Sequence, residues 1–230
     1  MTRKFDPIAW DNWRRDEFEK SCDNPDGWIS VGSNLVESGA LFASHWAASN
    51  RIMLRNVLKG GSATDKPRTP DEEEIVRFGV RTFSVQLMLF SFAIECLLKG
   101  LYIQKGGVLH KDGRYRSPKK LNKSHNLLEI AEVLGLDTLF SDEQKLILDE
   151  LSASNERGRY PIHSAYHHYT FQPPEPHGSG RSYAFWNAHN SATVHEILSI
   201  LYKALGVDIP ASADALVEYG RVVDRSYNPV

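Results

Sequence analysis

The segment from residue 69 to residue 103 constrains the fold more than any other part of the chain. Thr69 is expected to cap a helix there, because Pro70 suits the first helical position and Glu72 completes a Thr-x-x-Glu capping box. From residue 83 to residue 103 the sequence is apolar on nearly every side of this helix. Such a helix has to be surrounded by other elements, so we predict that it is the central, buried helix of an all-α domain.

The same apolar helix is not expected to span a membrane. Glu95 and Lys99 interrupt it, and its uncharged stretch, residues 82–94, falls well short of the ~20 residues that a span needs. The N-terminal segment, with Trp10-Asp-Asn-Trp13-Arg-Arg, is too polar for a signal peptide. We therefore expect a cytoplasmic protein that does not engage a membrane.

Composition narrows the function classes. The chain has 230 residues, of which 41% are hydrophobic, enough for a sizeable core. Its formal charge of −2 argues against a protein that coats nucleic acid by bulk charge. Cys22 and Cys96 are too few for a disulfide framework or a four-thiolate zinc site. No metal and no cofactor are predicted.

Helical periodicity dominates the chain, and alternating strand patterns are scarce. We predict one all-helical domain over residues 1–230, with a core at about 34–168 and a C-terminal extension at about 171–230. Gly135 followed by Leu136 is typical of a glycine helix end, and Ser141 with Gln144 forms a capping box. The other helices are expected at residues 7–21, 34–58 (capped by Ser33 or Asn34), 124–134, 141–160 (before Pro161), 192–205 (with Thr193-x-x-Glu196 near its start) and 211–223.

A basic segment follows the central helix. Residues 105–123 carry seven Lys or Arg and one acidic residue, Asp112. We predict a loop there, and in a slightly acidic chain this loop is the obvious surface for attracting phosphate groups. Lys119 and Lys120 are its predicted substrate-binding cations. The alternative interpretation is an ordinary solvated loop.

Glu95 lies within the apolar central helix, where an unpaired charge would be costly. It therefore needs a cationic or backbone-donor partner. Arg157 or Arg159 is the natural candidate from elsewhere in the chain, while Lys99, one turn on, could form an i,i+4 pair with it. Glu95, Lys99 and His125 are thus predicted structural residues, and the ring of His125 is expected to cap its own helix through a local hydrogen bond.

Three segments, taken in order, resemble the HEPN domain family. They are Ala93-Ile-Glu-Cys-Leu-Leu-Lys-Gly-Leu-Tyr-Ile103, Ser124-His-Asn-Leu-Leu128 and Asn155-Glu-Arg-Gly-Arg-Tyr-Pro161. The resemblance covers roughly residues 34–168 and implies an antiparallel helical bundle that pairs as a homodimer. Many members of this family are metal-independent endoribonucleases of toxin–antitoxin, phage-defence and RNA-processing systems. An antitoxin or a nucleotidyltransferase is the partner protein that the resemblance implies.

The resemblance also implies a catalytic pair, an Arg followed within a few residues by a His. Arg157 and His163 fit this pattern. In this chemistry the 2′-hydroxyl of the RNA attacks the adjacent phosphate. Histidine moves a proton near neutral pH, and arginine stabilises the charge that develops on the phosphate. The alternative is a non-catalytic HEPN-like module that binds a nucleotide, RNA or a partner protein.

Residues around this pair are candidates for substrate contact. Arg159, Tyr160 and His167 are predicted to bind substrate, and the aromatic run at residues 166–171 could stack unpaired bases. The other interpretation is a partly buried aromatic face, with Arg159 paired to a carboxylate such as Glu95 and Tyr160 packed. His163, His167 and a neighbouring histidine have no carboxylate or cysteine within one helical turn, so no zinc site is predicted.

Overall fold

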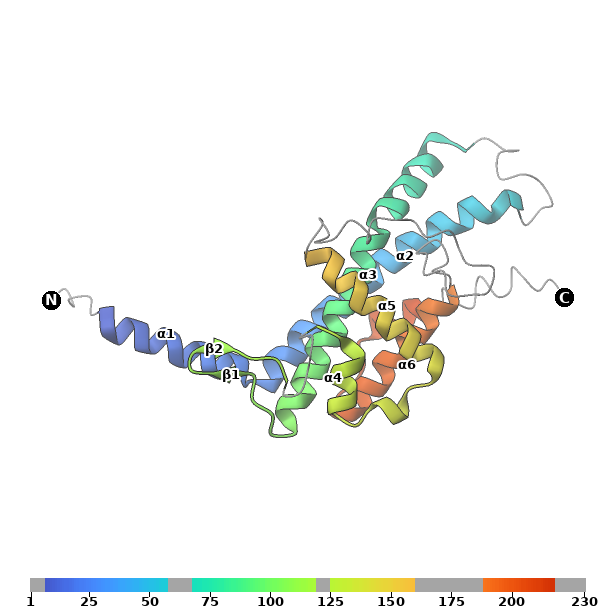
Figure 1. Cartoon of the computed structure of the whole chain (residues 1–230). Coiled ribbons are helices and arrows are strands. Elements are labelled where there is room, and N and C mark those ends of the chain that lie inside the picture. The colour runs from blue at the N-terminus through green and yellow to red at the C-terminus, as the bar shows by residue number, and fades with distance from the viewer. Residues whose placement is uncertain (1–6, 58–67, 119–124, 160–187, 218–230) are drawn as a thin grey trace, which may run out of the picture.

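The computed structural model describes residues 7–57, 68–118, 125–159 and 188–217, and these residues form an all-α fold, as predicted (Figure 1). A two-stranded hairpin is the only sheet in these ranges. The elements are α1 (Pro7–Cys22), α2 (Pro25–Val57), α3 (Pro70–Gln104), β1 (His110–Lys111), β2 (Arg114–Tyr115), α4 (Leu127–Val133), the 3₁₀ turn η1 (Asp137–Leu139), α5 (Asp142–Arg159), α6 (Ala188–Leu205) and the 3₁₀ turn η4 (Ala211–Ala213).

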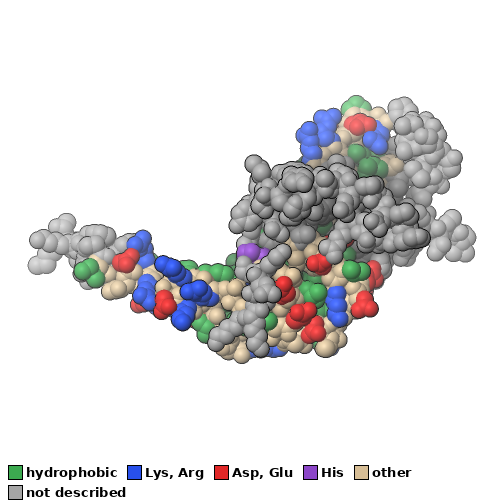
Figure 2. Space-filling view, viewed as in Figure 1, with side chains coloured by type: hydrophobic (Ala, Val, Ile, Leu, Met, Phe, Trp, Pro, Cys, Tyr) green, Lys and Arg blue, Asp and Glu red, His purple; other side chains and the backbone are tan. Residues whose placement is uncertain are grey.

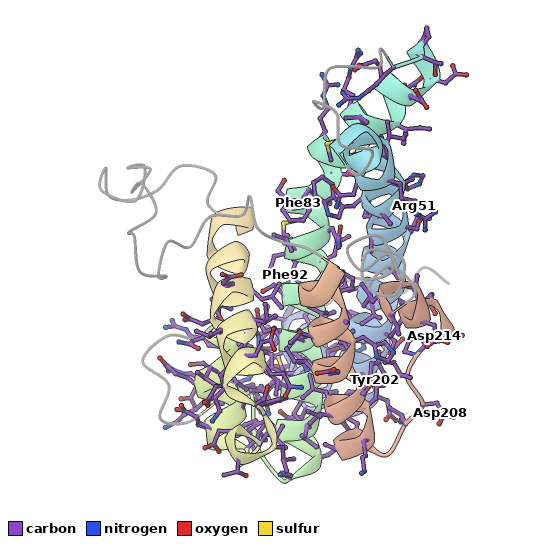
Figure 3. The ribbon with its side chains drawn as sticks, turned by 90° about the vertical axis from the view of Figure 1, so that its right-hand side faces the viewer. Arg51, Phe83, Phe92, Tyr202, Asp208 and Asp214 are labelled. Atoms are coloured by element: carbon purple, nitrogen blue, oxygen red, sulfur yellow. The ribbon has the colours of Figure 1, made fainter. Side chains whose placement is uncertain are left out.

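The helices α2 and α3 form a long antiparallel pair, and α4, α5 and α6 pack against its lower half (Figure 1). In Figure 3, α3 lies between α5 and α2, with α6 in front of them. The hydroxyl groups of Ser33 on α2 and Tyr202 on α6 share a 2.8 Å hydrogen bond, which ties these two helices together. The first helix, α1, extends away from the bundle, and the β1–β2 hairpin lies along it (Figure 1).

Buried apolar side chains from α3 form the centre of the core, as expected for the central helix. They pack with buried side chains from α2, α4, α5 and α6. The largest fully buried side chains of this core are Tyr202, Phe90, Leu87, Ile94, Leu97, Leu98, Leu127, Ile130, Leu148, Leu151 and Ile197. By length and composition α3 could cross a membrane, but 72% of its most apolar window is buried inside the structure. The core helix of a folded domain is buried to this degree and passes the same test of length and composition. The test is therefore only weak evidence that α3 spans a membrane.

Several local predictions are confirmed. The Thr69 hydroxyl accepts from the Glu72 amide at 3.2 Å, and the Glu72 carboxylate accepts from the Thr69 amide at 3.0 Å. The same reciprocal bonds join Ser141 and Gln144 at the start of α5. At the end of α4, Gly135 has a φ of 69° and its amide donates to the carbonyl of Glu132. These motifs set where α3, α4 and α5 begin or end.

Other boundaries differ from the prediction. The helix α2 begins at Pro25 rather than Asn34, because a proline fits the first turn and Asp26 complements the positive end of the helix dipole. The helix α6 begins at Ala188 rather than at residue 192, so Thr193-x-x-Glu196 lies inside it, and Glu196 accepts from Gln144 of α5 at 2.9 Å. Residues 105–118 are not merely a loop, since they contain the β1–β2 hairpin.

Close packing of α2 on α3 depends on small residues. A Cβ atom added at Gly79 would lie 2.5 Å from the Cβ atom of Ser49, nearer than two helices can tolerate without shifting. We expect Gly79→Val to lower the free energy of unfolding by about 1–3 kcal/mol, as overpacking does. Urea denaturation measures this loss. Adding Ser49→Gly, which removes the opposing Cβ atom, should recover part of it, and an unchanged midpoint for Gly79→Val would contradict the close approach.

Candidate functional site

A buried ion pair lies in the lower half of α3. Glu95 and Lys99 are one helical turn apart and expose only 2% and 4% of their surface. The Lys99 ammonium donates a hydrogen bond to Oε1 of Glu95. The i,i+4 alternative predicted for Glu95 is therefore confirmed. Paired in this way, neither charge carries the full cost of burial alone.

His125 joins this pair from a distant part of the chain. Its Nδ1 atom lies 2.9 Å from Oε1 of Glu95, and 36% of its side chain is exposed. The prediction that the ring caps its own helix is wrong. Asn126 caps α4 instead, because its short side chain can accept from the amides of Leu128 and Glu129, both at 3.1 Å.

The position of His125 is set by the way α4 is anchored. The Ser152 hydroxyl on α5 donates to the Leu148 carbonyl and accepts from the amide of Leu127, the first residue of α4, at 3.0 Å. Leu127 is fully buried in the core. Packing of α4 against α5 and α3 therefore places His125, the residue before the cap Asn126, beside Glu95.

Two aromatic rings cover the ammonium group of Lys99. Its Nζ atom lies 5.1 Å from the ring centroid of Trp28, on the first turns of α2, and 5.0 Å from that of Tyr115, on β2. Both distances are in the range of cation–π attraction. The indole of Trp28 is held in turn, since its Nε1 donates to the carbonyl of Cys22 at 2.9 Å. Four separate segments thus meet at this cluster.

The pKa of Lys99 lies above its ordinary value. Burial works to lower it, but the carboxylate of Glu95 and then the side chain of Tyr115 outweigh that effect. The amine of Lys99 therefore stays protonated at neutral pH, and it is not a candidate nucleophile. Because the pKa is raised on folding, the stability that this group contributes is complete below pH ~10.4 and is lost only as the pH rises through the folded-state value.

A second polar contact holds the hairpin to the end of α1. Nε2 of His110 lies 2.8 Å from Oδ2 of Asp23, and the amide of Leu109 donates to Oδ1 of the same carboxylate at 3.2 Å. Glu19 on α1 stands 3.9 Å from Nδ1 of His110 and accepts from Arg15 at 3.1 Å. The pKa of Glu19 is lowered, chiefly by the hydrogen bond from Arg15. These contacts fix the hairpin beside Lys99.

The remaining predicted site residues fall at the edge of the described chain or beyond it. Arg157 and Arg159 lie in the last turn of α5, where the structure describes the backbone alone, so their predicted pairing with Glu95 stays a prediction. The other predicted residues, Lys119, Lys120, Tyr160, His163 and His167, lie outside the described residues. Within the described ranges, no group of three His, Cys, Asp or Glu side chains could hold a metal ion.

Sequence reasoning missed the parts of this site that come from the hairpin and from α2. Asp112-Gly113 between two short polar runs is a hairpin turn signal, and it could have predicted β1 and β2. No comparable signal marks Trp28, because its role depends on α2 passing next to the end of α3. Among protein-family models, curated proteins and solved structures, no match to this chain was found.

Proposed function

We propose that this chain is a HEPN-like protein that acts on RNA as a metal-independent endoribonuclease. The observation that carries the proposal is the pairing of His125 with Glu95: a buried carboxylate holds Nδ1 of a partly exposed imidazole, beside a hairpin rich in cations. A carboxylate in this position favours the tautomer that carries the proton on Nδ1, so Nε2 becomes the atom that exchanges a proton with a substrate.

Two kinds of group are needed for cleavage through the 2′-hydroxyl. A base has to accept the proton of that hydroxyl, and a cation has to stabilise the charge that develops on the phosphate. We assign these roles to His163 and Arg157, the pair that the HEPN resemblance implies. His125 is a second candidate for proton transfer. Arg157 lies in the last turn of α5.

A non-catalytic module that binds a nucleotide, RNA or a partner protein is the second candidate function. The burial of Glu95 and Lys99 favours it, because groups that expose 2% and 4% of their surface brace the fold rather than touch a substrate. In this alternative His125 completes a structural network with Glu95 and Lys99. The cations of the hairpin then bind the nucleotide or RNA, and the protein does not cleave it.

The proposal includes a homodimer in which Arg157 and His163 of two subunits share one cleft. Exposed apolar side chains on the α2–α3 pair support an association surface, among them Leu41, Ile75 and Phe78. An antitoxin or a nucleotidyltransferase is the partner protein that the family resemblance suggests.

Cleavage of RNA in the presence of EDTA tests the proposed function. The purified full-length chain should cut single-stranded RNA without a metal ion, because the mechanism uses none. The products should end in 2′,3′-cyclic phosphates, because the nucleophile is the 2′-hydroxyl of the substrate. DNA of the same sequence lacks that hydroxyl and should stay intact. Binding of RNA without any cut would favour the binding module instead.

A further inference from the structure

The β1–β2 hairpin is a rigid element with two chemically different faces. Its strands pair His110 with Tyr115 and Lys111 with Arg114. The two turn residues, Asp112 and Gly113, have φ angles of 53° and 67°, as a type I′ hairpin turn requires. Because side chains alternate along a strand, the two paired sets of residues point to opposite faces.

The inner face is held against the helices. His110 contacts Asp23, and the ring of Tyr115 lies over the ammonium of Lys99. The amide of Arg116 donates to the carbonyl of Leu109 at 2.8 Å, which closes the base of the hairpin. Contacts at both ends therefore hold the hairpin in one orientation.

The outer face carries only cations. Lys111, Arg114 and Arg116 are all exposed, and within the described part of the chain no acidic side chain pairs with any of them. The acid of the turn, Asp112, is next to Gly113, against which Arg15 of α1 lies. Figure 2 shows Lys and Arg side chains gathered over α1 and the hairpin. We call Lys111, Arg114 and Arg116 the outer cationic face.

Lys105 belongs to the same basic segment but has a different role. Its ammonium donates to the carbonyl of Leu134 at 2.9 Å and so caps the end of α4. The described part of the basic segment, residues 105–118, therefore divides into one cation that caps a helix and three exposed cations that have no partner among the described residues.

We propose that the outer cationic face binds the phosphate backbone of single-stranded RNA. The inference rests on the proposed function, and it names the surface that would receive the substrate. Two arginines can each grip a phosphate through two parallel hydrogen bonds, and a fixed hairpin loses little freedom on binding. On the inner face of the same hairpin, Tyr115 contacts Lys99, Lys99 contacts Glu95, and Glu95 contacts His125, the second candidate for proton transfer.

Salt-dependent binding of an RNA that cannot be cut tests this inference. The probe is a short fluorescent oligouridylate with 2′-O-methyl riboses, and anisotropy gives its affinity over a range of salt concentrations. Replacing Lys111, Arg114 and Arg116 together by Gln should weaken binding and reduce the slope of log K against log salt by about 2, since each phosphate contact on a single strand contributes about 0.7. A matched variant, with Arg77, Arg81 and Lys203 replaced by Gln, removes three exposed cations elsewhere and should keep the wild-type slope.

The outcomes separate this inference from the proposed nuclease. If the hairpin variant loses affinity while the wild type fails to cut unmodified RNA, the outer cationic face stands and the nuclease is overturned. If the hairpin variant and the matched variant have the same slope as the wild type, the inference is wrong whether or not RNA is cut. No binding of the probe by the wild type would also overturn it. The inference is also wrong if the protein binds phosphatidylserine vesicles through these three residues and does not bind the RNA probe.

Discussion

Glu95→Ala is expected to lower the free energy of unfolding by about 3–5 kcal/mol, because it leaves the buried ammonium of Lys99 without its carboxylate. Lys99 is 4% exposed, so water does not easily replace the lost partner. The substitution also removes the acceptor of His125. Urea denaturation of the wild type and the variant measures this difference.

Two controls show whether the loss of stability comes from leaving Lys99 buried without a partner. Replacing Glu95 and Lys99 together by Met should restore most of the stability, because an apolar pair of similar volume carries no unpaired charge. Asp11→Ala breaks an exposed pair with Arg14, 2.7 Å apart, and should cost at most about 1 kcal/mol. A loss below about 0.5 kcal/mol for Glu95→Ala, the size of an ordinary surface change, would show that the ion pair does not stabilise the fold.

The largest expected effect on activity comes from the implied catalytic pair. If the chain cleaves RNA, His163→Ala should reduce the rate by about 10²–10⁴-fold, the contribution of one general acid or base. Arg157→Ala should remove most of the rate as well, because the charge on the phosphate then lacks its cation. Each variant should keep the wild-type mass in light scattering. Single-turnover cleavage of a labelled RNA measures the rates.

His125 provides an internal comparison in the same experiment. His125→Ala should slow cleavage if this histidine transfers a proton, while His45→Ala, which changes an exposed histidine far along α2, should not. A pH–rate profile separates proton transfer from a structural role, since loss of a reacting group changes the profile and loss of a brace changes only the amplitude. If neither His163→Ala nor Arg157→Ala alters cleavage, the catalytic pair is wrong and the activity belongs to another site or to a contaminant.

Local sequence signals predicted much of the secondary structure. The capping boxes at Thr69 and Ser141 and the glycine end at Gly135 each join residues only a few positions apart, so their hydrogen bonds do not depend on the rest of the fold. The apolar composition of α3 predicted that Glu95 is buried and needs a partner, and Lys99, one turn on, was one of the candidates. The start of α2 was missed because Pro and Asp suit a helix start as well as a turn.

The sequence by itself therefore determined the all-α class and the central position of α3. It required a partner for Glu95 but left the choice open between Lys99 and an arginine of α5, and the structure shows the pair with Lys99. Only the tertiary structure decided what surrounds that pair. His125, Tyr115 and Trp28 come from three other segments, and each reaches the pair because a helix end or a hairpin is anchored elsewhere, at Ser152, Asp23 or Cys22. Contacts between distant segments depend on how whole helices and the hairpin pack against one another. The residue pattern within one segment does not predict which other segments it will contact.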